Sequence, residues 1–290
     1  MESPIKKNFL PIMTIALIFL LRILILMRLD ILPDEAYYWD WSRFLSLGYY
    51  DHPPMVAWLV HLTTSVFGDT YWGIKAAPLL MGLGVSIVMF LLATRYLKSP
   101  ASLSLLVIML NATLLYAVGG LLLTPDIPFL FFWLLGLFVG YEAVFKNRPL
   151  AWLTLGMVVG LGLLSKYLFL LFIASFGLYL LIDRSYRPLL LTWKPWLALL
   201  IAVLFFSPNL VWNARHAWAS YAFQFGHGFN REGAWPKVNL LLEYLGGQIG
   251  LFSPFLFVVL VLAVVFYFRH GRESSLLYLL TFLAVPLLFF

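Results

Sequence analysis

The segment from Leu32 to Pro54 reads LPDEAYYWDWSRFLSLGYYDHPP and is the first polar stretch after the first apolar run of the chain. It gathers ionisable side chains among tyrosine and tryptophan rings, although only 11% of the 290 residues are charged. Such a cluster indicates a site for a polar ligand at a membrane surface, or a capped helix with an interfacial aromatic belt. The acids and the histidine of the segment are Asp34, Glu35, Asp40, Asp51 and His52.

The start of this segment predicts a helix. Pro33 is pre-set for a first helical turn, and the acids that follow it meet the positive end of the helix dipole. In a helix one face then carries a carboxylate and three rings, because the spacing is i, i+3, i+4 and i+7. A carboxylate beside rings suits a sugar-like ligand, although helix capping explains the acids equally well. The residues on this face are Asp34, Tyr37, Tyr38 and Trp41.

Composition predicts an all-α, polytopic membrane bundle that forms a single domain over residues 1–290. The chain is 63% hydrophobic with a mean hydropathy of +0.94, and many runs are long enough to cross a hydrocarbon core of about 30 Å. It has no cysteine, which excludes disulfides and thiol chemistry, and its histidines form no HExxH or HxH pair. The net charge of +6 does not indicate nucleic-acid binding, because the cations lie beside hydrophobic runs.

We predict about nine spans and a cytoplasmic amino terminus, because Lys and Arg concentrate in short turns on one side. The outer loops are then about 30–72 and 213–251, and Met55 to Phe67 forms a helix in the outer interface. The last run continues to Phe290 without a polar tail, which predicts a chain cut within or just after a span. The expected spans are 9–29, 73–95, 101–121, 127–145, 150–165, 167–182, 195–212, 252–268 and 274–290.

This topology brings distant polar residues to one outer face. Asp126 ends the Leu-Thr-Pro-Asp sequence before a span, and Lys166 interrupts a run about twice the normal length. A lysine is costly in hydrocarbon and so predicts a polar cavity, with snorkelling to lipid phosphates as the alternative. Asp126 has an alternative as the cap of the span that begins at Ile127, and His52 has one as a fixed turn residue before two prolines.

The order of these features resembles the GT-C glycosyltransferases that use polyprenyl- or dolichyl-phosphate sugars, including protein O-mannosyltransferases and the aminoarabinose transferase of lipid A. The likeness covers nearly the whole chain, although family members are usually longer. The matching stretches are Asp34-Glu35-Ala36-Tyr37-Tyr38, Tyr50-Asp51-His52-Pro53-Pro54, Leu123-Thr124-Pro125-Asp126, Gly162-Leu163-Leu164-Ser165-Lys166-Tyr167 and Ser207-Pro208-Asn209-Leu210-Val211-Trp212-Asn213-Ala214.

The resemblance implies a transferase of the bacterial plasma membrane with its active site on the periplasmic face. Its partners would be a lipid-linked sugar donor, membrane lipid, and a glycan, lipid or protein acceptor. Asp34 would be the general base or would orient the acceptor, with Glu35 as support or cap and Asp126 as a second acid. Some GT-C enzymes use a divalent cation, but no independent metal cage is evident. Candidates to bind the donor phosphate or substrate are Lys166, Arg215, His52, Asp51, Tyr37 and Tyr38.

Two other classes of protein remain open from sequence alone. A transporter or lipid flippase would also explain charge inside the membrane, and a purely structural membrane subunit is the second alternative. Convergence of Asp34, Asp126 and Lys166 at one membrane face favours a transferase, whereas a polar path across the bilayer favours transport.

Overall fold

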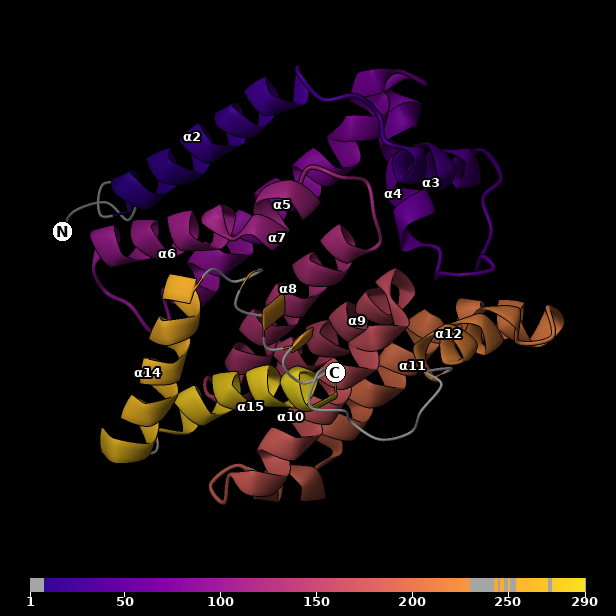
Figure 1. Ribbon diagram of the computed structural model, residues 1–290. Helices are drawn as coiled ribbons and strands as arrows, with labels where there is room; N and C mark the ends of the chain where they lie inside the picture. The colour runs from indigo at the N-terminus through magenta and orange to yellow at the C-terminus, as the bar shows by residue number, and fades with distance from the viewer. Residues whose placement is uncertain are drawn as a thin grey trace.

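The computed structural model describes residues 8–229, 243–244, 246–247, 250, 254–270 and 273–289. Throughout these ranges the regular structure is helical, and no strand is present. The helices form a bundle, and α3 (Pro33–Arg43) and α4 (Met55–Phe67) lie together at one end of it (Figure 1). The predicted all-α membrane architecture is confirmed.

The described residues of every predicted span are mostly helical. Four helices are long and apolar enough to cross a membrane, and further apolar helices are shorter. The long helices are α2 (Phe9–Leu26), α5 (Tyr71–Ala93), α8 (Asp126–Val144) and α11 (Trp193–Arg215). The shorter ones include α6 (Pro100–Ala112), α9 (Pro149–Ser165), α10 (Leu170–Ile182), α14 (Pro254–His270) and α15 (Ser274–Phe289).

The run predicted as one span over 101–121 is two helices instead. α6 ends at Ala112, Thr113 takes an extended conformation with φ −64° and ψ 131°, and α7 (Leu114–Gly119) follows. At this break the guanidinium of Arg22 donates to Asn111 Oδ1 at 3.1 Å and to the carbonyl of Tyr116 at 3.2 Å. The charge of Arg22 is thus buried in the bundle and bound to the polar groups of the break, as an intramembrane arginine requires.

The predicted break at Lys166 is confirmed. Lys166 is extended, with φ −157° and ψ 135°, between the end of α9 and the short 3₁₀ helix η1 (Tyr167–Phe169) that leads into α10. α9 packs closely along α11, because glycines at 156 and 160 let the backbones approach. A Cβ on Gly156 would lie 2.5 Å from the carbonyl oxygen of Ala198.

The predicted first outer loop contains both predicted helices, α3 and α4, and the segment 44–54 between them has no regular structure. After α11 the chain turns through Ala217 and Trp218, both with positive φ, into α12 (Ala219–Phe229). Most of the predicted outer loop 213–251 beyond α12 lies outside the described residues.

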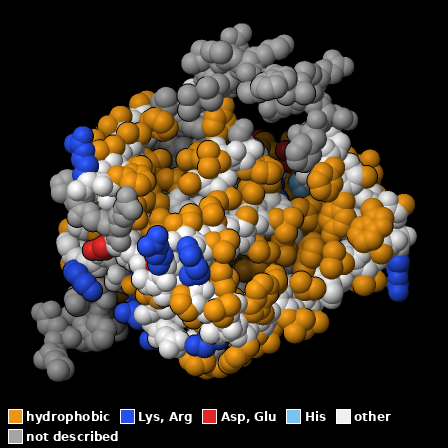
Figure 2. All heavy atoms as spheres, turned by 90° about the horizontal axis from the view of Figure 1, so that it is seen from below, with side chains coloured by type: hydrophobic (Ala, Val, Ile, Leu, Met, Phe, Trp, Pro, Cys, Tyr) orange, Lys and Arg blue, Asp and Glu red, His pale blue; other side chains and the backbone are white. Residues whose placement is uncertain are grey.

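The surface of the bundle is largely apolar. Figure 2 shows hydrophobic side chains over most of one face, with most of the Lys and Arg side chains of that face toward one side. At the opposite end of α8 from Asp126, Glu142 binds Arg95 at 2.7 Å and Arg148 at 2.8 Å. Glu142 is 5% exposed and closes an ion-pair network.

Candidate active site

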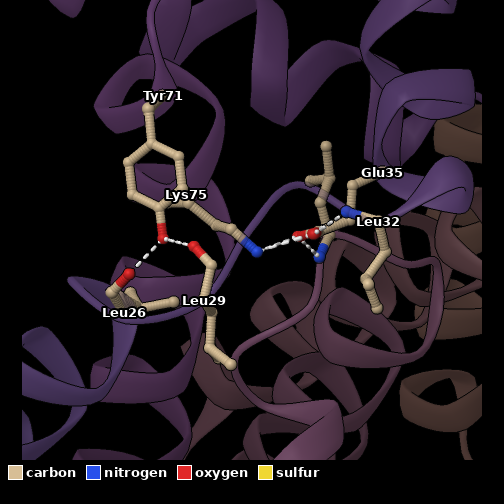
Figure 3. A network of polar contacts seen from close by, with 7 residues as sticks. Leu26, Leu29, Leu32, Glu35, Tyr71 and Lys75 are labelled. Atoms are coloured by element: carbon tan, nitrogen blue, oxygen red, sulfur yellow. Dashed lines mark hydrogen bonds and ion pairs between the residues drawn. The ribbon is translucent and has the colours of Figure 1, made fainter.

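A fully buried ion pair fixes the start of α3. Glu35 accepts from Lys75 Nζ on α5 at 2.8 and 2.6 Å, and it also accepts from the backbone N–H of Leu32 at 3.0 Å (Figure 3). Neither Glu35 nor Lys75 is exposed to solvent. The predicted role of Glu35 as support and cap is therefore what its contacts show.

Glu35 also holds the loop that leads to Asp126. The backbone N–H of Leu123 donates to Glu35 Oε1 at 2.9 Å, so α3 and the segment before α8 share one buried carboxylate. Because Glu35 is buried and already binds three donors, it is not placed to touch a substrate, and we interpret it as structural rather than catalytic. Its neighbour Asp34 is exposed, since adjacent helical positions point about 100° apart.

Asp126 and Lys166 meet at the same end of the bundle. Lys166 Nζ lies 2.6 Å from Asp126 Oδ1, with the lysine side chain 24% exposed and the aspartate 62% exposed. Asp126 is the first residue of α8, after Pro125 as the N-cap, and its side chain does not cap the helix. The alternative prediction that Asp126 caps the helix is wrong. Lys166 pairs with the carboxylate of Asp126, whereas the alternative prediction was that it extends to lipid phosphates.

Tyr38 marks the point where the acids converge. Burial raises the pKa of the Tyr38 phenol, and the negative charges of Asp51, Asp34 and Asp126 raise this pKa further. These charges come from three separate parts of the chain, the start of α3, the segment 44–54 and the start of α8. Asp34 and Asp126 lie at the same end of the bundle, because Glu35 beside Asp34 binds the N–H of Leu123 shortly before Asp126.

His52 lies beside the same groups. Burial lowers the pKa of its imidazole, Asp51 and Asp126 raise it, and the positive charge of Lys166 lowers it. The net effect lowers the pKa of His52 below its ordinary value of 6.5, which favours the neutral ring. Its Nδ1 is buried without a hydrogen-bond partner among the described residues, so the predicted phosphate contact would use a neutral ring rather than a cation.

Aromatic rings line the approach to the acids. The Tyr37 hydroxyl lies 3.4 Å from Asp51 Oδ1, and its side chain is 46% exposed. Tyr38 is packed edge-on against Trp41 at 5.1 Å, and Trp41 stacks on Tyr49 at 4.1 Å. The predicted face of α3 therefore forms, and it joins the segment 44–54 through ring contacts.

Two features differ from the sequence-based expectation. Arg215 is exposed at the end of α11, and no described contact joins it to the acids or to Lys166. Lys75 was not identified, although the reasoning that singled out Lys166, a lysine in an apolar run, applies to it as well.

The described residues contain no preformed metal-binding cluster. No group of three or more His, Cys, Asp or Glu side chains among them is close enough to hold an ion. A divalent cation would have to rely on Asp34, Asp51 or Asp126 together with substrate oxygens, a set that does not form a dedicated cage.

An acid and lysine cluster at one end of a bundle of membrane helices defines a polytopic membrane protein of the GT-C class. The fold matches the crystal structure of ArnT from Cupriavidus metallidurans in the apo state, with a TM-score of 0.61 over 94% of this chain and 59% of that chain at 18% identity. Residues 51–212, more than half of the chain, match the family model described as dolichyl-phosphate-mannose-protein mannosyltransferase, and the chain belongs to this family.

Two curated relatives are bacterial glycosyltransferases by name. The chain is 27% identical to the lipid A galacturonosyltransferase RgtD of Rhizobium johnstonii over 89% of this chain and 54% of that protein. It is 30% identical to an undecaprenyl phosphate-alpha-4-amino-4-deoxy-L-arabinose arabinosyl transferase of Pseudomonas paraeruginosa over 64% of this chain and 37% of that protein. The chain thus spans about half the length, or less, of the curated relatives it matches.

Proposed function

We propose that this chain is the membrane part of a glycosyltransferase that moves a sugar from a polyprenyl-phosphate donor to an acceptor at the membrane surface. The observation that carries the proposal is the contact of Lys166 with Asp126 at 2.6 Å at the end of the bundle that also carries α3. Glu35, next to Asp34, binds the N–H of Leu123 shortly before Asp126, and Asp51 lies 3.4 Å from the Tyr37 hydroxyl of α3. The charged groups of this cluster lie at one end of the bundle and form no path across it, which favours a transferase over a transporter.

In this reaction the acceptor oxygen bonds to the anomeric carbon of the sugar while the bond from that carbon to the phosphate oxygen breaks. Asp34, exposed at the start of α3, takes the proton when the acceptor is a hydroxyl. Lys166 stabilises the negative charge that develops on the leaving polyprenyl phosphate. If the acceptor is itself a phosphate, no base is required and Asp34 only orients it.

Asp126 and the rings complete the site. Asp126 holds the ammonium of Lys166 at 2.6 Å and, with 62% of its side chain exposed, also accepts from sugar hydroxyls. Tyr37, 46% exposed, offers a flat surface to the apolar face of a sugar, and the buried Tyr38 ring packs behind it with 5.5 Å between the ring centroids. His52 and Asp51 contact the donor from the segment 44–54.

The donor tail requires an apolar surface next to the site. A small groove of about 60 Å³, lined by apolar side chains, lies between α9, α10 and α11. Val159, one of its lining residues, lies about 9 Å along α9 from Ser165 at the helical rise of about 1.5 Å per residue. A long polyprenyl chain whose phosphate is at Lys166 reaches this groove.

The orientation is also part of the proposal. The end of the bundle opposite the site carries Arg95, Arg148 and Lys194, and by the positive-inside rule this supports a cytoplasmic position for that end and a periplasmic position for the site. Single cysteines in this cysteine-free chain test it: a cysteine at Asp40 is expected to react with a membrane-impermeant maleimide in intact cells, and one at Lys194 only after lysis.

The experiment for the activity is turnover of an undecaprenyl-phosphate sugar, with lipid A as acceptor, by membranes containing this chain. Asp34→Asn is compared with Asp40→Asn, a matched control because Asp40 is exposed on the same helix and pairs only with exposed Arg43 at 3.6 Å. Release of undecaprenyl phosphate by wild type and Asp40→Asn, but not by Asp34→Asn, supports the proposal. Full activity of Asp34→Asn would rule out proton abstraction by Asp34.

A further inference from the structure

Three side chains of α11 and α12 donate hydrogen bonds to alternate backbone carbonyl groups of the segment 47–51, which carries Asp51. Asn209 Nδ2 on α11 donates to the carbonyl of Leu47 at 3.0 Å, and Gln224 Nε2 on α12 donates to that of Asp51 at 2.5 Å. Between them the hydroxyl of Ser220 donates to the carbonyl of Tyr49. The three donors therefore bind every second peptide group, as a neighbouring strand would.

Asn209 also contacts the part of the site that carries Lys166. Asn209 is fully buried, and its Oδ1 accepts from the hydroxyl of Tyr167 at 3.2 Å. Tyr167 directly follows Lys166, so one amide joins the segment 47–51 to the break that presents the lysine. Asn213, also fully buried, donates to the Tyr167 hydroxyl at 3.3 Å and keeps the ring in place.

Gly48 shows that this contact is close. A Cβ added to Gly48 would lie 2.6 Å from the ring of Trp212 and 2.8 Å from Asn209 Nδ2. The backbone of the segment thus rests directly on α11, where only glycine fits. From its other side the segment is bound to α3, because Tyr49 stacks on Trp41 and donates its hydroxyl to the carbonyl of Trp41 at 3.0 Å.

We propose that Asn209, Ser220 and Gln224 are positioning residues that fix the register of the segment 47–51, and thereby set Asp51 and His52 against Asp126 and Lys166. A slip by one residue would move Asp51 by about 3.3 Å, the rise of an extended chain, and would turn its side chain to the opposite side. Fixed amide and hydroxyl donors prevent this slip, because each backbone carbonyl released from its donor would lose its hydrogen-bond partner. The positioning role itself does not depend on the proposed transferase function. Only its expected effect on turnover rests on that function.

The test measures the register without using activity. Cysteines replace Tyr50 and Phe223, whose ring centroids lie 5.1 Å apart, in a chain that otherwise has no cysteine. A short bifunctional maleimide is then applied to the full chain in membranes, and the cross-linked peptide pair is quantified by mass spectrometry. Efficient cross-linking is expected in this background.

Two isosteric variants remove single donors. Asn209→Asp keeps the acceptor for Tyr167 but loses the donor to Leu47, and Gln224→Glu places a carboxylate against the carbonyl of Asp51. Cross-linking is expected to fall about fivefold in each, the population change produced by the loss of one hydrogen bond. Ser207→Ala is the control, since the Ser207 hydroxyl binds only the carbonyl of Leu204 in its own helix at 2.8 Å.

Unchanged cross-linking in both variants overturns the proposal, whatever their thermal stability. Reduced cross-linking in both, with the Ser207→Ala value at the wild-type level, supports it. Where the wild-type chain turns over donor, the two variants are expected to raise the KM for donor at least about fivefold. Reduced cross-linking in a chain whose wild type shows no turnover would contradict the transferase function and leave the positioning role standing.

Discussion

Lys75 Nζ lies 2.6 Å from Glu35 Oε2, and this pair joins α5 to α3 in a place that solvent does not reach. The carboxylate also holds the N–H groups of Leu32 and Leu123, so the start of α3 and the approach to α8 depend on one ion pair. The acids of the candidate site follow directly after these two anchored backbones, at Asp34 and Asp126.

Lys75→Met is expected to destabilise the protein by about 3–5 kcal/mol, because it leaves a buried carboxylate without its cation. Thermal unfolding in detergent measures the loss. Glu35→Gln combined with Lys75→Met is expected to recover part of it, since no buried charge remains. A double variant less stable than Lys75→Met alone would contradict this account of the pair.

Asp34→Asn is expected to lower kcat by about 10² to 10⁴ for a hydroxyl acceptor, the usual contribution of a general base. The melting temperature should not change, because Asp34 is exposed and the helix start is held by Glu35. Steady-state kinetics on undecaprenyl-phosphate sugar, with Asp40→Asn as control, check this. A large fall in melting temperature together with activity would point to a structural role instead.

Lys166→Met is expected to reduce turnover by about 10² to 10³, the effect of removing one group that stabilises charge in a transition state. Its effect on stability is expected to be at most about 1 kcal/mol, because the pair with Asp126 is partly exposed to solvent. Turnover and thermal unfolding measured on the same preparations separate the two effects. Activity at the wild-type level would remove Lys166 from the reaction.

Acidification is expected to destabilise the protein through His52. The folded-state pKa of this imidazole lies below the ordinary value of 6.5, so the unfolded chain binds a proton first as the pH falls. His52 therefore does not affect stability well above pH 6.5. As the pH falls below 6.5 towards the lowered pKa of the folded state, the protein loses stability. His52→Gln should lose less melting temperature than wild type between pH 7.5 and 5.5, and an equal loss would contradict the assignment.

The sequence predicted the ends of several elements because the signals are local. Pro33 with its acids marks the start of α3, and the polar break in a double-length apolar run marks Lys166. The convergence of Asp34 with Asp126 also followed from counting apolar runs, because each crossing of a membrane alternates the side on which a loop emerges.

Which of two adjacent acids is buried was not predictable in the same way. Asp34 and Glu35 are equivalent as local signals, and only the position of Lys75, 40 residues later, decides that Glu35 is inside. The break in the run 101–121 was missed for a similar reason, since Arg22 of another span binds Asn111 Oδ1 and the carbonyl of Tyr116 on either side of the break at Thr113.

The amino-acid sequence by itself therefore determined the membrane-helical class, the family resemblance and the end of the bundle at which the acids lie, because hydrophobic length and short motifs act locally. The tertiary structure alone decided which side chains are structural and which are exposed to a substrate. The partners of Glu35, Asn209 and Lys166 come from remote segments, and burial of a polar group such as Glu35 is favourable where packing supplies a partner.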